Sequence, residues 1–549
     1  MIHLYLLIKF ISSFYTTVKY SYIANKFFKN KSFNSFLEKN PSVWKKIELS
    51  NNYIACDCTD YNPMNLMINL VNAKFLQKIY KCKLLVIDKY PNKYRNALYK
   101  SFLSDKIVYL YDLKNIFNFQ TSKDYLQLPK VDNIEDFVKI NFDYFKIGKV
   151  SYDMFLRKSF AGSSKKVTSH MKFELYNSIF IISRIKKLLN NYNIIAYTTH
   201  EIQFNPQAYL IQFFLKKNIS VFCKSIGQTH ISIRKYNKFF DIFTPRQNIT
   251  KNLFLNIKKN FPKKAEYGKQ FIEDRFNSIG NKFEDAPDSK FAFNKTHFSF
   301  SKKELYKKYN WELEKPLVLV LANNIYDGVF EKRRSIFIDN YTWLKITLEL
   351  LAKNKKINIL VKKHPTENSI PSIKDKTTNL VKSISKNDNI RLYPENLSLN
   401  SVKNYVNAVF TDHGTAGIEY SNFGIPVVTS SDSRYSCANF VYECKKLDEY
   451  TKIISNIDNL KKLSEEKINN VRIFTFINQM LTKVYFPLNP KIDTYAKNFD
   501  TSFWDTLDKT IKDFKFEESE FYNMLKKMID TNSYNLINYK LIDNNEKKI

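Results

Sequence analysis

Apolar residues follow two alternating patterns along most of the chain. Short apolar runs with the length of strands alternate with longer segments in which apolar residues recur every three or four positions, as in an amphipathic helix. In the first half the strand pattern occurs at residues 52–58, 83–87, 106–112, 193–201 and 219–225, and the helical pattern at residues 63–81, 92–102 and 205–218. This order is typical of a parallel sheet with crossover helices.

The alternation begins again after a stretch of different character. Residues 276–300 contain Gly, Pro and Asn and have no sustained period, which predicts a linker. Further strand patterns lie at residues 316–322, 357–363, 389–393, 407–412 and 425–430. We therefore predict an α/β fold of two doubly wound, Rossmann-like domains, residues 1–290 and 301–440, with their boundary between residues 275 and 305. Residues 441–549 have a mainly helical pattern, and we expect them to pack back on the first domain.

The composition shows that the chain folds but leaves the meaning of its charge open. Hydrophobic residues make up 44% of the 549 residues, with 46 Phe and 36 Tyr, which argues against disorder. The formal net charge is +34, yet the lysines are spread along the whole chain and no zinc-finger spacing, RRM motif or basic heptad accompanies them. We expect no nucleic-acid partner, and two interpretations remain: solvated lysine-rich faces, or peripheral contact with an anionic membrane or substrate.

Cysteine usage and the apolar segments suit a cytoplasmic protein. The six cysteines form no C-x-x-C pair and no His-partnered zinc spacing, so reduced thiols are expected. The apolar opening, residues 1–20, is interrupted by Lys9 and Lys19 and has no cleavage site. It indicates neither a signal peptide nor a spanning helix, but an amphipathic surface helix stays open. We expect a cytoplasmic protein, at most attached to the inner face of the cytoplasmic membrane.

Three of the nine glycines lie within residues 411–428, whose sequence is TDHGTAGIEYSNFGIPVV. A strand ends here at Asp412 and a helix begins just after Gly414, so the turn lies at the carboxyl edge of the sheet, where open α/β sheets bind ligands. Gly414 permits a tight turn, Thr415 supplies a hydroxyl, and Glu419 follows one helical turn later. The helix start suits a phosphate and the carboxylate suits ribose hydroxyls; the alternative is an ordinary βα turn with a surface glutamate.

Other polar residues follow strands of the same half. His364 comes directly after a strand and two lysines, and can donate to a phosphate oxygen. Asp327 follows the strand at 316–322, and Ser430 and Ser431 follow the last strand. Each also fits a structural role, as a His-Pro strand end, an Asp-Gly turn or serines at a strand end. Together they predict one polar site at this edge of the sheet.

These motifs resemble the C-terminal, nucleotide-sugar-binding half of GT-B glycosyltransferases. The stretches YDG, WLKITLELLAKNKKINILVKKHP and FTDHGTAGIEYSNFGIPVV are similar to bacterial capsule and surface-polysaccharide transferases related to capsular Kdo transferases, and to the motifs of bacterial CMP-sialic acid transferases. The resemblance covers about residues 315–435, and IGKVSYDMFLR (147–157) is similar to a weaker stretch of the first half in such proteins. It implies a GT-B fold whose two domains face a cleft, with the donor bound by the second domain and the acceptor by the first.

The resemblance also implies a function. The enzyme would transfer a sugar, such as an acidic sugar from CMP-Kdo, from a nucleotide-activated donor to a surface or capsular glycan or glycolipid. Neither a bound metal nor another cofactor is implied, because helix N-termini and cationic side chains can offset the charge of the leaving phosphate. The donor-binding residues that it implies are Asp327, His364, Gly414, Thr415, Glu419, Ser430 and Ser431.

The catalytic base is expected in the first half, where Asp153 and His200 are the candidates. Asp153 precedes Arg157 by one helical turn, which would hold it ionised; the alternative is a surface ion pair. His200 ends a strand at a carboxyl edge, where a histidine can act as a base near neutral pH or simply be hydrogen-bonded. Asp57 and Asp60, after the first strand, are acceptor-side candidates of lower rank.

Two other functions stay open. Polyol-phosphate transferases that use CDP-glycerol or CDP-ribitol also carry a His-Pro motif, but HGTAGIE replaces their usual paired serines. A basic binding protein with a GT-B shell and no turnover would have the same strand and helix pattern. A UDP-sugar 2-epimerase is disfavoured, because the Gly-Gly-x-x-Glu-Glu run of those enzymes is absent.

Overall fold

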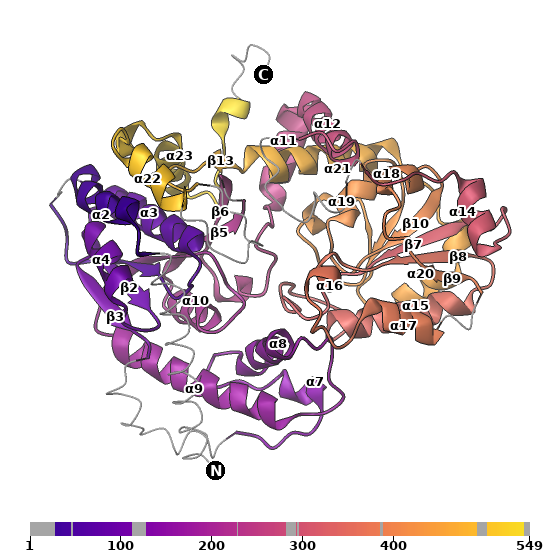
Figure 1. Ribbon diagram of the computed structural model, residues 1–549, viewed down its shortest axis with the longest axis horizontal. Coiled ribbons are helices and arrows are strands. Elements are labelled where there is room, and N and C mark those ends of the chain that lie inside the picture. Colours follow the sequence, from indigo (N-terminus) through magenta and orange to yellow (C-terminus); the bar gives the residue numbers. More distant parts are fainter. Residues whose placement is uncertain are drawn as a thin grey trace. The chain divides into compact units, whose positions relative to one another are not determined.

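The chain forms two compact α/β units (Figure 1). The computed structural model describes residues 28–44, 48–111, 128–227, 229–280, 293, 296–384, 388–490 and 502–542. Within these, unit 1 consists of the residues up to 152, 167–242 and 484–537, and unit 2 of residues 153–166, 243–483 and 538–542. The expectation of an α/β fold with two Rossmann-like halves is confirmed. The apolar opening at residues 1–20 lies outside the described residues.

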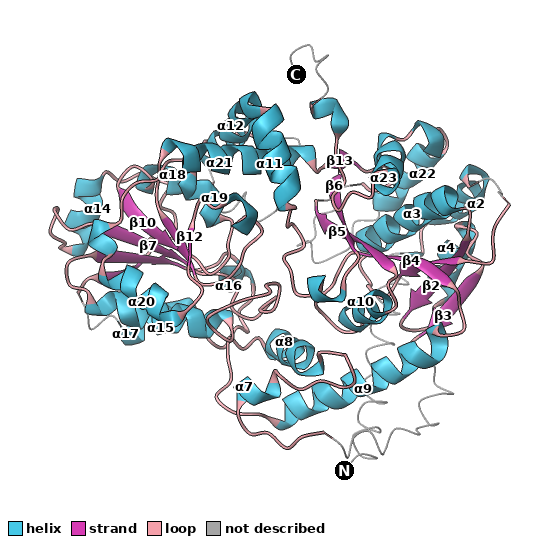
Figure 2. Ribbon diagram, turned by 180° about the vertical axis from the view of Figure 1, so that it is seen from behind, coloured by secondary structure: helices cyan, strands magenta, loops and turns pink. Residues whose placement is uncertain are grey.

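Unit 1 is built on a seven-stranded sheet with the order β13-β6-β5-β4-β1-β2-β3. The strands from β5 to β3 run parallel, whereas β6 and β13 are antiparallel to their neighbours. Figure 2 shows α3 on one face of this sheet and α10 on the other. The strands are β1 (Tyr53–Asp57), β2 (Lys83–Asp88), β3 (Lys106–Tyr109), β4 (Ile194–Thr199), β5 (Ser220–Ile226), β6 (His230–Tyr236) and β13 (Val484–Tyr485). The helices are α2 (Lys31–Val43), α3 (Pro63–Tyr80), α4 (Lys93–Ser101), α7 (Ile134–Phe137), α9 (Ser169–Leu189), α10 (Gln207–Lys216), α22 (Ser502–Ile511) and α23 (Glu520–Asp530). Helix α8 (Ile147–Ser159) runs from unit 1 into unit 2.

The end of the chain completes the core of unit 1. Helix α22 packs on α2, where Trp504 is fully buried and its ring centroid lies 4.5 Å from that of Phe33 and 5.7 Å from that of Phe36. Burial of large aromatic rings is a major source of core stability. The expected C-terminal helical segment divides between the units, because residues 441–483 belong to unit 2 and residues 484–537 to unit 1.

Unit 2 is built on a six-stranded, fully parallel sheet with the order β12-β11-β10-β7-β8-β9. Helices α15, α17 and α20 cover one face, and α18 and α19 lie on the other (Figure 1). The strands are β7 (Leu317–Leu321), β8 (Asn358–Lys362), β9 (Ile390–Leu392), β10 (Val406–Phe410), β11 (Val427–Thr429) and β12 (Tyr442–Glu443). The helices are α11 (Lys251–Asn260), α12 (Ala265–Phe276), α14 (Lys302–Tyr309), α15 (Asn340–Lys353), α16 (Thr366–Ser369), α17 (Thr377–Ile384), α18 (Leu399–Val402), α19 (Ala416–Ser421), α20 (Leu447–Ser455) and α21 (Glu465–Phe476).

One passage from unit 1 to unit 2 lies between Ile242 and Phe243, so α11 and α12, which precede the predicted linker, belong to unit 2. Helix α12 packs closely on α21: a Cβ added to Gly268 would lie 1.9 Å from the carbonyl oxygen of Arg472. The two helix backbones touch at this glycine. Such a tertiary contact cannot be predicted from the change in composition near residue 276.

Candidate functional site

The polar residues at the carboxyl edge of unit 1 gather where its strand order reverses. From β1 the chain adds β2 and β3 on one side and then β4 on the other, so the carboxyl ends of β1 and β4 lie side by side. Open α/β sheets bind ligands at such a switch point. Asp57 is the last residue of β1, and His200 directly follows β4.

Asp57 ties these two strand ends together. One carboxylate oxygen accepts hydrogen bonds from the backbone N–H and hydroxyl of Thr59, at 2.9 and 2.6 Å. The other accepts from the hydroxyl of Thr199 at 2.8 Å and lies 3.6 Å from Nδ1 of His200. Gln207, at the start of α10, donates to the Thr59 hydroxyl at 2.7 Å. The side chain of Asp57 is fully buried, and these contacts supply hydrogen-bond donors to both of its carboxylate oxygens.

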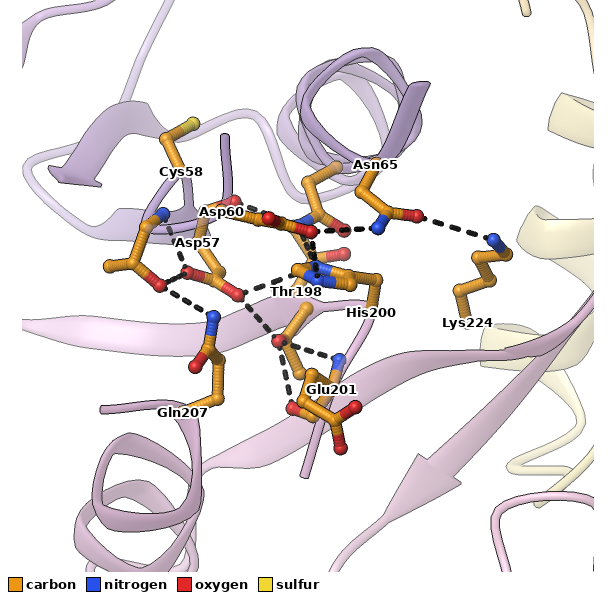
Figure 3. A network of polar contacts seen from close by, with 12 residues as sticks. Asp57, Cys58, Asp60, Asn65, Thr198, His200, Glu201, Gln207 and Lys224 are labelled. Carbon is orange, nitrogen blue, oxygen red and sulfur yellow. Dashed lines mark hydrogen bonds and ion pairs between the residues drawn. The ribbon is translucent and has the colours of Figure 1, made fainter. Parts of the chain in front are cut away.

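His200 lies beside a second carboxylate, that of Asp60 (Figure 3), and beside the amide of Asn69. Its Nε2 is 2.9 Å from Oδ2 of Asp60, and its Nδ1 is 3.0 Å from Nδ2 of Asn69. Asn69 Nδ2 also donates to the carbonyl of Asp57 at 2.8 Å. The ring donates through Nε2 to Asp60, and both of its nitrogens have partners.

These contacts shift both pKa values in the direction of an ion pair. Burial alone lowers the pKa of His200, but the hydrogen bond to Asp60 and the charges of Asp60, Asp57 and Glu201 raise it above its ordinary value. Burial alone raises the pKa of Asp60, but His200, Asn65 and backbone N–H groups hold it well below its usual range.

Asp60 is the more accessible member of the pair. Its side chain is 31% exposed, whereas that of His200 is 9% exposed. Asn65, in the first turn of α3, donates to Oδ2 of Asp60 at 2.7 Å, and Lys224 of β5 donates to the Asn65 side chain at 3.4 Å (Figure 3). The arrangement presents an ionised carboxylate with an imidazole behind it, which can accept hydrogen bonds from hydroxyl groups.

Unit 2 has a second buried carboxylate at its own switch point. The chain proceeds from β7 to β8 on one side and returns to β10 on the other, and Asp412 follows β10. The fully buried Asp412 accepts hydrogen bonds from Lys332 Nζ and from the hydroxyls of Ser430 and Ser431. Burial alone raises the pKa of Asp412, but Lys332 and His413 hold it well below its usual range. The two serines, expected to bind a donor phosphate, are fully buried and donate to Asp412 in this structure.

His413 lies next to the Asp412 carboxylate. Its Nδ1 lies 3.1 Å from Oδ2 of Asp412 and 3.2 Å from the amide nitrogen of Asn323, and its side chain is 17% exposed. Among the described residues, no polar group contacts its Nε2. Asn323 follows β7, so the two strands at the switch point both contribute to holding this ring.

The glycines of residues 411–428 serve close contacts in the turn. A Cβ on Gly414 would lie 2.7 Å from the hydroxyl oxygen of Thr411, which accepts from the Gly414 N–H at 3.3 Å. A Cβ on Gly417 would lie 2.2 Å from the hydroxyl oxygen of Tyr435, which donates to the Gly414 carbonyl at 2.9 Å. Gly424 has a φ of +76°, which favours glycine. Thr415 precedes α19 and is partly exposed, and its hydroxyl does not cap the helix.

Three further sequence candidates of unit 2 are Asp153, Asp327 and His364. Asp153 is 1% exposed and its carboxylate accepts from the Val329 N–H at 3.4 Å, while Arg157 donates to Asp327 at 2.9 Å. Arg157 therefore contacts a donor-site candidate of the same unit. His364 Nδ1 lies 2.9 Å from the hydroxyl of Thr366, at the start of α16.

The loop after β8 also borders a cavity. This cavity has a volume of about 420 Å³ and is lined by residues of α16, α17 and their connection, including Lys363, Lys376 and Asn368. The lining carries the ammonium groups of Lys363 and Lys376 together with the carboxylate of Glu367, so it suits a hydroxyl-rich ligand. No group of three or more His, Cys, Asp or Glu side chains in the described ranges is arranged to hold a metal ion.

The sequence pattern missed three residues of the unit 2 network, Lys332, Asp412 and His413. Asp412 and His413 stand inside the TDHGT turn, so their place at a strand end was a usable signal. Lys332 lies in the long connection between β7 and α15, and nothing in its sequence surroundings indicates that it reaches Asp412.

No protein-family model matches the chain, and no curated protein matches it. Several solved structures are similar at a low level. One is KpsC of Thermosulfurimonas dismutans, a beta Kdo 2,4 transferase, with 12% identity over 58% of this chain and 88% of that chain and a TM-score of 0.31. Others are a glycosyltransferase of Rickettsia africae (10% identity, 90% and 99% covered, TM-score 0.26) and HepE of Anabaena in complex with UDP (9% identity, 84% and 100% covered, TM-score 0.26). At these scores and identities the likeness carries no argument about this chain's site.

Proposed function

We propose that this chain is a glycosyltransferase that moves a sugar from a nucleotide-activated donor to a surface or capsular glycan. The observation that carries the proposal is the same in both units: a histidine beside a carboxylate at the switch point of a parallel sheet. The pairs are His200 with Asp60 in unit 1 and His413 with Asp412 in unit 2. Two switch-point sites in one chain suit an enzyme that binds two substrates.

We assign the donor to unit 2. The turn at Gly414 keeps backbone close to the strand ends, His413 presents an imidazole nitrogen, and the cavity after β8 is lined by Lys363 and Lys376. Such groups suit the phosphates of a nucleotide, because N–H groups and cations stabilise the charge on a leaving phosphate. A CMP-linked acidic sugar such as CMP-Kdo is the specific donor that the sequence resemblance of residues 315–435 favours.

We assign the acceptor to unit 1. During transfer, the acceptor hydroxyl loses a proton as its oxygen bonds to the sugar, and the nucleotide leaves with the bonding electrons. Asp60 would accept a hydrogen bond from that hydroxyl, orient it and take its proton, with His200 balancing the charge behind it. Asp153 stays a second candidate for the base, although it is buried in this structure.

Incubating the protein with CMP-, CDP- and UDP-linked donors and following their consumption tests the reaction class. A glycosyltransferase consumes a nucleotide-sugar donor, whereas release of CMP from CDP-glycerol indicates a polyol-phosphate transferase. Calorimetry with the free nucleotides tests the donor site: His413→Gln should weaken binding about tenfold or more, as expected for loss of a hydrogen bond to a charged group. His170→Gln, at a half-exposed position on α9, is the control. If none of the nucleotides binds and no donor is consumed, a non-catalytic binding protein explains the fold better.

Peripheral contact with an anionic membrane is part of the proposal. The chain has 87 Lys and Arg against 53 Asp and Glu, and no helix in the described ranges combines the length and hydropathy needed to cross a bilayer. Binding to anionic vesicles should fall as salt is raised from 0.1 M to 1 M, because the Debye length falls from about 10 Å to about 3 Å. Retention at 1 M salt would contradict an electrostatic contact.

A further inference from the structure

A buried arginine lies beside the His200 site without contacting His200. Arg95, on α4, is 2% exposed, and its guanidinium is surrounded by partners. Its Nη1 donates to the carbonyl of Asp60 at 2.9 Å, and its Nη2 donates to the carbonyl of Cys58. Nη2 also donates to Asp88 at 3.0 Å, and Nε donates to the hydroxyl of Tyr99 at 2.9 Å.

The partners of Arg95 are themselves fixed. Asp88 is the last residue of β2 and is 1% exposed; it accepts from the Tyr99 hydroxyl at 2.6 Å. The ring of Tyr61 lies against the guanidinium, with 5.2 Å between the ring centroid and the central carbon of Arg95. Arginine suits this position because its planar fork can donate to several acceptors at once, whereas a lysine has one ammonium on a flexible stem.

These contacts define the loop that carries Asp60. The carbonyls of Cys58 and Asp60 point at Arg95, while the N–H groups of Tyr61 and Asn62 donate to the Asp60 carboxylate at 2.6 and 3.2 Å. The guanidinium of Arg95 therefore holds two main-chain carbonyls of this loop. The Asp60 carboxylate holds the two backbone N–H groups that follow it. In this conformation Oδ2 of Asp60 lies 2.9 Å from Nε2 of His200.

We propose that Arg95 is a positioning residue that holds the loop from Cys58 to Asp60 so that the Asp60 carboxylate meets His200. A buried guanidinium is costly to desolvate and is retained where it satisfies several acceptors. Arg95 neither touches His200 nor faces a substrate in this arrangement; it acts through the two carbonyls. The effect on His200 follows from the geometry alone, and only its consequence for turnover rests on the proposed function.

The test is the titration of His200, followed by NMR of the imidazole signals and assigned with His200→Gln. Arg95→Lys keeps the positive charge but loses the planar guanidinium that donates to both carbonyls. The loop should then become less ordered, and the pKa of His200 should fall from its raised value toward the ordinary one. Asp60→Asn should produce a fall in the same direction. Arg275→Lys, which makes the same change at a similarly buried ion pair of unit 2, is the matched control and should leave the His200 titration as in the wild type.

Two outcomes would overturn the proposal. If Arg95→Lys folds, by its thermal melting, and His200 titrates as in the wild type, Arg95 only stabilises the unit. Should Arg95→Lys not fold, Arg95→Gln takes its place, because its single amide group cannot donate to the carbonyls of Cys58 and Asp60 as the guanidinium does. An unchanged His200 titration in that folded variant would likewise show that Arg95 does not position the loop. If His200 shifts but the wild-type protein consumes no nucleotide-linked donor, the positioning role stands and the proposed function fails.

Discussion

Arg275 Nη1 donates to Oε1 of Glu419 at 2.8 Å, and the two side chains are only 10% and 9% exposed. Glu419 is therefore engaged by α12 of its own unit, in a place where the sequence suggested a carboxylate available to ribose hydroxyls. A buried ion pair is sensitive to the loss of one partner, because the other charge stays desolvated without compensation.

Glu419→Ala should consequently lower the stability of unit 2 by roughly 3 kcal/mol, the size found when one partner of a buried ion pair is removed. The measurement is urea unfolding, and the double variant Arg275→Met with Glu419→Met should recover most of the loss. Calorimetric nucleotide affinity of the folded fraction separates the two roles. A large loss of affinity with unchanged stability would show that Glu419 serves the ligand and not the ion pair.

Gly417→Ala should destabilise the turn that precedes α19. The new methyl group would lie 2.2 Å from the hydroxyl oxygen of Tyr435, so the tyrosine must move and lose its hydrogen bond to the Gly414 carbonyl. Overpacking of this kind costs about 1–3 kcal/mol. Gly280→Ala is the control, since no atom of the residues that the structure describes lies within 4 Å of its added Cβ. Equal melting temperatures for the two variants would contradict the close packing.

The alternation of apolar runs was enough to predict two α/β halves, because a strand buried on both faces needs a continuous apolar run and a covering helix needs an apolar stripe. The same pattern indicated the strand ends at which Asp57, His200 and Asp412 lie. A local signal also marks the start of α14, where the side chains of Ser301 and Glu304 each accept a hydrogen bond from the other's backbone N–H.

The partners of these residues could not be predicted in the same way. Lys332 is 80 residues from Asp412 in sequence, and Arg275 is 144 residues from Glu419, so each pair depends on the tertiary fold. Ser430 and Ser431 stand at a strand end as expected, but whether their hydroxyls face a ligand or a buried carboxylate is decided by side-chain direction at that edge. A strand-end position therefore identifies a candidate, and only the packed structure identifies its partner.

The stability of unit 1 should depend on pH through His200. The folded pKa of His200 is raised because Asp60, Asp57 and Glu201 outweigh the effect of burial. A group with a raised folded pKa contributes stability that is complete below its unfolded pKa, about 6.5 for histidine, and that is lost as the pH rises through the folded value. His200→Asn should therefore be most destabilising below about pH 6.5 and progressively less so above it. Denaturant unfolding between pH 5 and 9 measures this.

Asp60→Asn is the comparison for that experiment. Without the Asp60 carboxylate the main cause of the raised pKa is gone, so the pH dependence attributable to His200 should flatten or reverse. A loss of stability in His200→Asn that is constant across this range would mean that the imidazole contributes packing alone.

Lys332→Met should be the most destabilising of these substitutions at neutral pH. Lys332 and Asp412 are 2% and 0% exposed, and removing the ammonium leaves the carboxylate buried with an uncompensated charge, at a cost of about 3–5 kcal/mol. In the wild type the lowered pKa of Asp412 gives stability that is complete above its unfolded pKa of about 3.9 and is lost as the pH falls below it. In the variant, burial is no longer offset by Lys332, so the pKa of Asp412 should rise above its unfolded value and the folded protein should bind a proton there.

The sign of the pH dependence then reverses for this residue. The loss of stability in Lys332→Met should be largest at pH 7. Its stability should approach that of the wild type as the pH is lowered toward 4, because protonation of Asp412 removes the buried charge. The double variant Lys332→Met with Asp412→Asn has no charge to bury, and its amide oxygen can still accept from Ser430 and Ser431, so it should be more stable at pH 7 than the single variant. Unfolding of the three proteins at pH 4, 5, 6 and 7 gives the comparison. A single variant that is equally destabilised at every pH, with no recovery in the double variant, would show that Lys332 fills space beside Asp412 and does not hold its charge.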